Sequence, residues 1–243
     1  MSDDLLVSNL FSVKDKVALI TGGGTGIGKM IAKAFVKNGA IVYIASRNKT
    51  AASRDKTSID DEMGPGKCFS IEANLDSKDA CEKLVTDFKN LGNDKLDILV
   101  NNSGTWHNSG LTDIPEDAFL PLLEKASKKL VDPSRVIITG SILGIGEGQT
   151  KALQALGLCA LAYRINVNVL APGYVPVADR MAEVDDLSVS EIPQGELDMA
   201  GAALYLASRA GSWISGIELV VDGGTLLQFK LTDVEKVQLP NIN

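Results

Sequence analysis

The sequence predicts a single α/β domain with a doubly wound parallel β-sheet. Short apolar segments alternate with segments of helical periodicity along the 243 residues, and this alternation is typical of strands joined by crossover helices. The apolar segments are rich in Val, Ile and Leu and do not alternate with polar residues, which indicates strands buried on both faces. The length suits one large domain, and no change of composition marks a second one.

Seven strands and five helices are predicted from these segments. The strands are expected at 17–20, 41–44, 67–71, 97–100, 135–139, 165–170 and 218–221. The helices are expected at 26–38, 78–91, 116–130, 150–163 and 198–208. We expect 1–12 to be an N-terminal extension, 13–225 to be the domain, and 226–243 to be a C-terminal tail.

Composition and charge disfavour several classes of protein. The 24 Lys and Arg residues are outnumbered by 31 Asp and Glu, and the net charge of −7 argues against nucleic-acid binding. Cys68, Cys81 and Cys159 are odd in number and lack metal-ligand spacing, so neither disulfides nor a metal site is expected. The chain has no basic and apolar leader and no apolar run of about 20 residues, so we expect a cytoplasmic protein without a membrane partner.

A glycine-rich turn lies between the first predicted strand and the first predicted helix. It runs from Thr21 to Gly28 and reads TGGGTGIG. Residues without a Cβ atom let the backbone approach a pyrophosphate, and the helix that follows offers its free N–H groups. The turn therefore predicts a Rossmann-type dinucleotide site, although glycine-rich turns also serve packing alone. The contacts with the nucleotide are expected from Gly22, Thr25, Gly26, Ile27 and Gly28.

The end of the second predicted strand indicates which dinucleotide is bound. Ser46 and Arg47 lie there, and no acidic residue does. An acid at this place would accept hydrogen bonds from the 2′-hydroxyl of NAD, whereas an arginine suits the 2′-phosphate of NADP. We therefore expect NADP, with NAD less favoured, and a solvated surface charge is the alternative for Arg47. Asn74 and Leu75, after the third strand, are expected either to contact adenine or to form an ordinary turn.

Five motifs occur along the chain in the order found in one protein family. They are the turn from Thr21 to Gly28, Asn101 to Gly104, Ser141, Pro172-Gly173, and Asp222 to Gly224. With this combination the chain resembles the short-chain dehydrogenase/reductase family over about residues 11–225. Its sequence at 135–141 and 165–173 is most similar to that of 3-oxoacyl carrier-protein reductases. The resemblance implies hydride transfer between a nicotinamide cofactor and a small carbonyl or alcohol substrate.

The resemblance also implies roles for particular residues. Ser141 matches the serine that steadies the substrate oxygen. Lys151 matches the lysine that binds the nicotinamide ribose and lowers the pKa of a catalytic tyrosine, a phenol whose free pKa of about 10 requires a nearby cation. Asn101, Pro172 and Gly173 match residues that line the cofactor.

The chain departs from the family pattern where the proton would be transferred. Glu147, and not a tyrosine, stands four positions before Lys151. Lys151 follows Ser141 by only 10 positions, so the segment that carries the tyrosine is missing. About a dozen residues, or three helical turns, are also missing after Phe119, and the family's asparagine is missing with them. Smaller contractions are expected before the sixth strand and before Glu196.

No other residue is a good substitute for the missing acid. Tyr43 belongs to a predicted strand and Tyr205 to a predicted helix. Tyr174 lies near the expected nicotinamide and is the best placed of the remaining tyrosines, but a proton donor must come within hydrogen-bond reach of the substrate oxygen. Glu147 would need a raised pKa, whereas the nearby cation of Lys151 lowers it.

These departures predict an NADP-dependent oxidoreductase of impaired activity. The alternative is a catalytically inactive dinucleotide-binding or interaction protein, which would arise as a degenerate copy, a splice variant or a misjoined gene model. Members of the family pair through their fourth and fifth helices, and these are the shortened ones here, so a homo-oligomer is not assumed.

Overall fold

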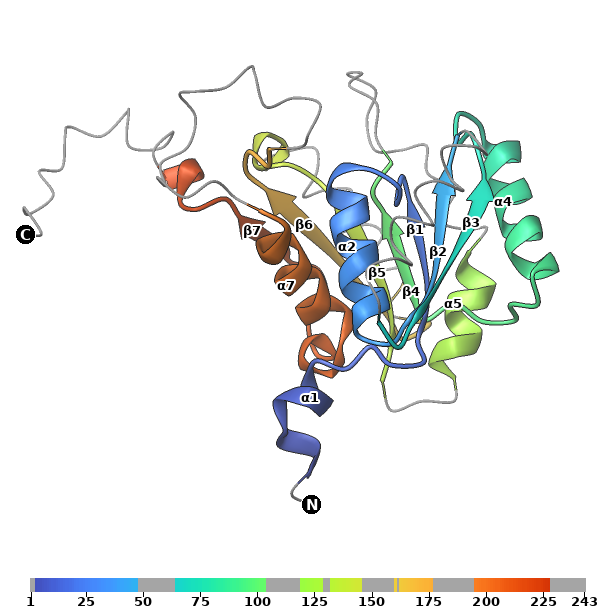
Figure 1. Ribbon diagram of the computed structural model, residues 1–243, viewed down its shortest axis with the longest axis horizontal. Helices are drawn as coiled ribbons and strands as arrows, with labels where there is room; N and C mark the ends of the chain where they lie inside the picture. The colour runs from blue at the N-terminus through green and yellow to red at the C-terminus, as the bar shows by residue number, and fades with distance from the viewer. Residues whose placement is uncertain are drawn as a thin grey trace, which may run out of the picture.

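The protein is described here by a computed structural model, which covers residues 3–47, 64–103, 119–128, 132–145, 160, 162–176 and 195–227. Its centre is a seven-stranded sheet of order β3-β2-β1-β4-β5-β6-β7, and every neighbouring pair is parallel. The strands are β1 (Val17–Thr21), β2 (Ile41–Ser46), β3 (Lys67–Glu72), β4 (Ile98–Asn101), β5 (Ser134–Thr139), β6 (Ile165–Pro172) and β7 (Glu218–Val221). The order reverses between β1 and β4, which confirms the predicted doubly wound sheet (Figure 1).

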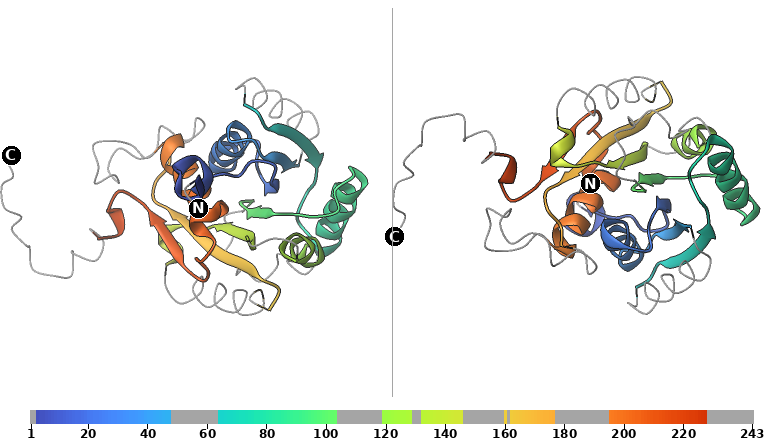
Figure 2. Two further views of the ribbon diagram at one scale, coloured as in Figure 1. Left: turned by 90° about the horizontal axis from the view of Figure 1, so that it is seen from below. Right: turned by 90° about the horizontal axis from the view of Figure 1, so that it is seen from above.

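Helices cover both faces of this sheet. The α-helices are α1 (Val7–Leu10), α2 (Gly26–Lys37), α4 (Lys78–Asn90), α5 (Leu120–Ser127) and α7 (Glu196–Ala207). Short 3-10 helices lie at Asp3–Leu5, Ile142–Gly144 and Arg209–Gly211. The α2 and α7 helices lie side by side on one face, and α4 and α5 lie on the other (Figures 1 and 2).

Side-chain alternation along the strands divides the interior into two cores. Ala18 and Ile20 of β1 pack in the core beneath α2 and α7, whereas Val17 and Leu19 pack in the core beneath α4 and α5. All four are buried, because every strand next to the centre has a helix above and below it. A strand covered on both faces needs no polar side, and this explains the continuous apolar run in the sequence.

The α2 helix shows how the sequence sets the ends of an element. Its apolar residues Ile31 and Phe35 are one turn apart and face the core. The helix ends at Lys37 because Gly39 takes a φ of +86°, where it donates its N–H to the carbonyl oxygen of Val36 at 3.0 Å. This end lies one residue before the predicted one at 38.

The predicted elements differ from the structure mainly at their ends. The helix predicted at 116–130 begins at Leu120 and ends at Ser127, and residues 116–118 and 129–130 lie outside the described residues. The predicted helix at 150–163 falls largely outside the described residues. Tyr163 lies in a turn, where its N–H donates to the carbonyl oxygen of Ala160, so the predicted end of this helix at residue 163 was wrong. Helix α1 and the 3-10 helices were not predicted, because segments of three or four residues are too short to show a period.

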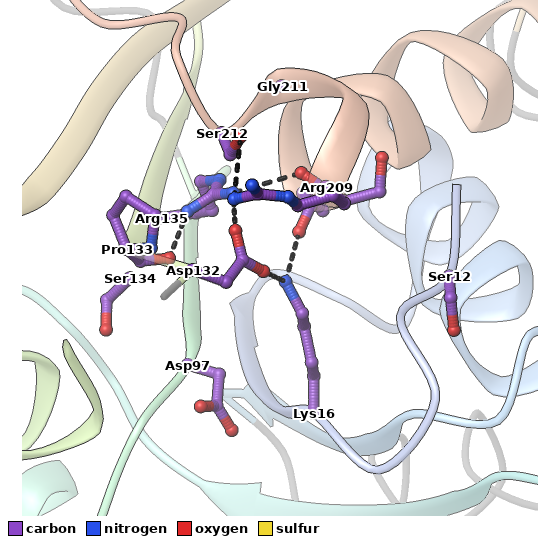
Figure 3. A network of polar contacts seen from close by, with 12 residues as sticks. Ser12, Lys16, Asp97, Asp132, Pro133, Ser134, Arg135, Arg209, Gly211 and Ser212 are labelled. Carbon is purple, nitrogen blue, oxygen red and sulfur yellow. Dashed lines mark hydrogen bonds and ion pairs between the residues drawn. The ribbon is translucent and has the colours of Figure 1, made fainter. Parts of the chain in front are cut away.

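The carboxyl ends of the strands meet at one edge of the sheet, and α1 lies at the opposite end of the molecule (Figure 1). That opposite end is held by a buried group of charges around Asp132 (Figure 3). Among the described residues, no helix is both long and apolar enough to cross a membrane.

Candidate nucleotide-binding site

The glycine-rich turn connects β1 to α2 at the carboxyl edge of the sheet. Gly22 and Gly26 take φ values of +63° and +52°, which other L-residues rarely adopt. A Cβ atom on Gly28 would lie 2.5 Å from both the Asn102 side-chain nitrogen and the Gly22 carbonyl oxygen. Only glycine fits at position 28, because the turn packs closely against itself and against Asn102 there.

Hydrogen bonds fasten this turn to the neighbouring strands. The Thr21 hydroxyl oxygen accepts from the backbone N–H groups of Asn102 and Ser103, both at 2.9 Å. The side-chain amide of Asn102 donates to the Thr21 carbonyl oxygen at 3.0 Å. On the other side, the Gly22 N–H donates to the carbonyl oxygen of Ala45 at 2.9 Å. The turn is thus held in a fixed position between β2 and β4.

The start of α2 leaves backbone donors for a ligand. Thr25 occupies the N-cap position but its side chain makes no capping hydrogen bond. The first amides of any α-helix have no partner within the helix, so those of Gly26, Ile27 and Gly28 are left at its N-terminal end. Together with the positive end of the helix dipole, these donors suit a pyrophosphate, and a turn without Cβ atoms leaves room for it.

A cavity of about 890 Å³ lies beside the ends of β2 and β3 and along α4, and it is the candidate place for the adenosine end of the predicted site. Arg47 and Asn74 both line this cavity, and their contact with adenosine stays a prediction. Ser46 is half-buried, and its carbonyl oxygen accepts from the Ala73 N–H at 2.9 Å. The side chain of Asn74 donates to Asp76 at 2.6 Å. Leu75 is half-buried and packs against the core beneath α4 and α5.

Sequence reasoning missed Glu72 at this end of the site. It found no acid at the end of β2, yet Glu72 ends β3, is paired in register with Ser46, and lines the same cavity as Arg47. The signal was present in the sequence, since parallel strands end at a common edge and Glu72 follows a predicted strand directly.

The expected nicotinamide side is described only in part. Asn101 is 5% exposed, and its side-chain nitrogen has no hydrogen-bond partner among the described residues. A buried donor left unpaired costs about 1 to 3 kcal/mol, so a polar ligand group or a further segment of chain would stabilise it. Pro172 is the last residue of β6, and the N–H of Gly173 donates to the carbonyl oxygen of Val221 at 2.9 Å. These residues all lie at the carboxyl edge.

The proton-transfer residues are split between described and undescribed segments. Ser141 is half-buried after β5, and its hydroxyl oxygen accepts from the Leu143 N–H at 3.2 Å. Lys151 and Glu147 lie outside the described residues, so the geometry between Ser141 and Lys151 stays a prediction. Tyr174 is half-buried directly after Gly173.

Two tyrosines are placed far from any role in catalysis. Tyr43 is 5% exposed in the core, with its ring centroid 5.0 Å from those of both Phe69 and Phe88. Tyr205 on α7 contacts the ring of Phe11 with centroids 6.5 Å apart. Among residues that the structure covers, no group of His, Cys, Asp and Glu could hold a metal ion.

Comparison with known proteins agrees with this geometry. A family model described as short chain dehydrogenase matches residues 16–126. The chain is 33% identical to the rhamnolipids biosynthesis 3-oxoacyl-[acyl-carrier-protein] reductase of Pseudomonas aeruginosa, over 88% of this chain and 97% of the relative. It is 31% identical to the short-chain dehydrogenase/reductase PhomF of Diaporthe leptostromiformis, over 93% of this chain and 96% of the relative.

A solved structure from P. aeruginosa, the RhlG/NADP active-site complex, has the same fold. Its TM-score with this chain is 0.78 at 28% identity, and the match covers 89% of this chain and 98% of the other. The match therefore extends over most of both chains.

The relatives contain residues that this chain lacks. The match to the P. aeruginosa reductase spans 255 alignment positions, but 88% of this 243-residue chain is about 214 residues. About 40 positions of that alignment therefore face no residue of this chain. The family model also ends at residue 126, before Ser141. A shortened chain is what the spacing of the motifs predicted.

Proposed function

The chain belongs to the short-chain dehydrogenase/reductase family of oxidoreductases, and on this premise we propose that it binds NADP but transfers hydride weakly or not at all. The observation that carries this proposal is the combination of an intact glycine cradle with the missing tyrosine four positions before Lys151. The first supports binding of a dinucleotide. The second removes the group that would exchange a proton with the substrate oxygen.

The residues at the edge of the sheet fit a dinucleotide. The turn at Gly22 to Gly28 offers backbone amides, and the Asn101 side-chain nitrogen is a buried donor without a described partner. Arg47 lines the adenosine cavity, where a guanidinium suits a 2′-phosphate. The P. aeruginosa relative is named in its structure as an NADP complex, which supports the same cofactor for this chain.

The catalytic side of the site is incomplete. A bound nicotinamide would supply or accept the hydride, with a small carbonyl or alcohol as substrate. Ser141 would hold the substrate oxygen, and Lys151 would hold the nicotinamide ribose. The tyrosine that delivers the proton in the family is missing four positions before Lys151, and loss of a general acid typically costs about 10² to 10⁴ in rate.

Turnover and binding can be separated in one assay. Purified protein is mixed with NADPH and a panel of ketones that includes a 3-oxoacyl thioester, and NADPH absorbance and fluorescence are followed together. We expect a saturable fluorescence change with no oxidation above the protein-free rate. Steady oxidation of NADPH, abolished by Ser141→Ala, would contradict the proposed impairment.

A second function is favoured by the absence of the tyrosine alone. It is that of a non-catalytic nucleotide-binding or interaction protein, which would use the dinucleotide as a structural ligand. This candidate predicts that NADPH raises the melting temperature while every substrate leaves the NADPH unoxidised. Slow but saturable ketone reduction would instead favour the impaired oxidoreductase.

The proposal includes a cytoplasmic location. This location rests on the sequence, in which Cys68, Cys81 and Cys159 are odd in number and lack the spacing of a disulfide scaffold. It includes no particular oligomer. Size-exclusion chromatography with light scattering measures the mass in solution, and a tight homotetramer would contradict the expectation from the shortened helices.

A further inference from the structure

We propose that Glu72 opposes Arg47 at the adenosine end of the site and lowers the preference of this chain for NADP over NAD. This inference rests on the proposed function, because it needs a dinucleotide at the carboxyl edge of the sheet. Glu72, at the end of β3, would be a second residue besides Arg47 that sets the preference between NADP and NAD.

Glu72 at the end of β3 and Arg47 directly after β2 line the same cavity. Glu72 is the last residue of β3 and is paired in register with Ser46, the last residue of β2. Neighbouring strands lie about 5 Å apart, so the Glu72 backbone lies beside the residue that precedes Arg47. Both residues are exposed, and both are among the residues that line the cavity. The end of β3 thus supplies the acid that is absent from the end of β2.

The two side chains favour different cofactors. A 2′-phosphate carries a charge of about −2, so the Arg47 guanidinium attracts it and the Glu72 carboxylate repels it. A 2′-hydroxyl is neutral and donates a hydrogen bond, which a carboxylate accepts and a guanidinium does not. Arg47 therefore raises the affinity for NADP, whereas Glu72 lowers it and raises the affinity for NAD.

Other carboxylates of the cavity are already engaged. Asp76 accepts a hydrogen bond from Asn74 at 2.6 Å, and Asp87 pairs with Lys83 at 2.5 Å. Within the described ranges, the side chains of Glu72 and Arg47 have no hydrogen-bond or ion-pair partner. Glu72 is therefore the acid of the cavity whose charge is left to act on a ligand.

The test compares dinucleotide binding by wild-type protein and the variant Glu72→Gln. Dissociation constants for NADPH and NADH are measured by fluorescence titration at low and at high salt. We expect NADPH to bind about threefold to tenfold more tightly to the variant at low salt, with NADH unchanged or weaker. The gain should shrink at high salt, because the interaction with the exposed carboxylate is screened. Glu82→Gln on α4 is the matched control, since it removes the same charge from an exposed site that does not line the cavity.

The outcomes separate this inference from the function on which it rests. A ratio of NADPH to NADH affinity that stays the same in Glu72→Gln overturns the role of Glu72 and leaves nucleotide binding standing. An equal rise in Glu82→Gln also overturns it, because net charge alone would then explain the change. Failure of the wild-type protein to bind either dinucleotide overturns both proposals together.

Discussion

The side-chain amide of Asn102 donates a hydrogen bond to the carbonyl oxygen of Thr21 at 3.0 Å. This bond joins the residue that follows β4 to the last residue of β1, and the Thr21 hydroxyl completes the link by accepting from the Asn102 N–H at 2.9 Å. The phosphate cradle is therefore not an independent loop. Its position depends on the end of a strand that lies 80 residues further along the chain.

The first prediction concerns this link. Thr21→Val keeps the shape of the side chain but leaves the N–H groups of Asn102 and Ser103 without their acceptor. We expect the free energy of unfolding to fall by about 1 to 3 kcal/mol and NADPH binding to weaken. Urea denaturation and fluorescence titration measure the two effects. Thr86→Val on α4 is the control, where loss of an exposed hydroxyl bonded to the Glu82 carbonyl should cost less than about 0.5 kcal/mol.

The second prediction concerns the glycine cradle. In Gly28→Ala the new methyl group would lie 2.5 Å from the Gly22 carbonyl oxygen, so the turn must shift. We expect a loss of about 1 to 3 kcal/mol in stability and a loss of saturable NADPH binding. Gly201→Ala is the matched change, because a Cβ atom on this glycine of α7 meets nothing within 4 Å. That variant should be unchanged or more stable by up to about 1 kcal/mol, and a destabilised Gly201→Ala would contradict the packing described here.

The third prediction concerns Arg47. Arg47→Gln removes the cation that lines the adenosine cavity, so we expect NADPH to bind roughly tenfold less tightly while NADH binding stays within about twofold. Titration of both dinucleotides against one protein preparation measures the difference. Equal weakening of the two cofactors would mean that Arg47 supports the fold of the site and does not discriminate between them.

The fourth prediction concerns pH and the buried charges at the amino edge of the sheet (Figure 3). Asp132 pairs with Lys16 and with Arg135, each at 2.5 Å. Burial acts to raise the pKa of Asp132, but the charges and hydrogen bonds of Lys16 and Arg135 outweigh it and hold that pKa below its ordinary value. A carboxyl whose pKa is lowered by folding stabilises the protein above its unfolded pKa of about 3.9 and loses this effect as the pH falls through the folded value.

Asp132→Asn should therefore lower the free energy of unfolding by about 3 kcal/mol at pH 7, because it leaves the buried Arg135 and the half-buried Lys16 without their carboxylate. The difference from wild type should shrink as the pH falls below about 4, and denaturant titrations across this range measure it. Asp94→Asn is the control, since its pair with Lys125 is exposed and should contribute less than about 1 kcal/mol. A difference that is constant with pH would contradict a role for the Asp132 charge.

Much of the fold was predictable because its signals are local. The apolar runs gave all seven strands to within two residues at either end, since a strand covered on both faces has no polar positions to confuse the pattern. The Gly39 stop of α2 was predictable for the same reason. The short helix α1 was not predictable, because a segment of four residues is too short to show a helical period. The start of α5 was not predictable either, because it follows the buried Phe119 and no periodic signal marks this position.

The candidate site was predictable where one segment forms it and less so where several do. The turn from Thr21 to Gly28 is one continuous segment, so its glycine motif could be recognised in the sequence. The cavity that joins Arg47 to Glu72 depends on the register of β2 with β3, which brings together residues 25 positions apart. The roles of Asn102 and Ser103 in fastening Thr21 likewise arise only when β4 lies beside β1.

Isothermal titration of the wild-type protein with NADPH tests the central claim most directly, because every role assigned above starts from a dinucleotide held by the β1–α2 turn. We expect one site per chain with a dissociation constant below the millimolar range, and loss of the heat signal in Gly28→Ala but not in Gly201→Ala. No detectable heat at millimolar NADPH, with the wild-type protein shown to be folded by circular dichroism, would contradict it.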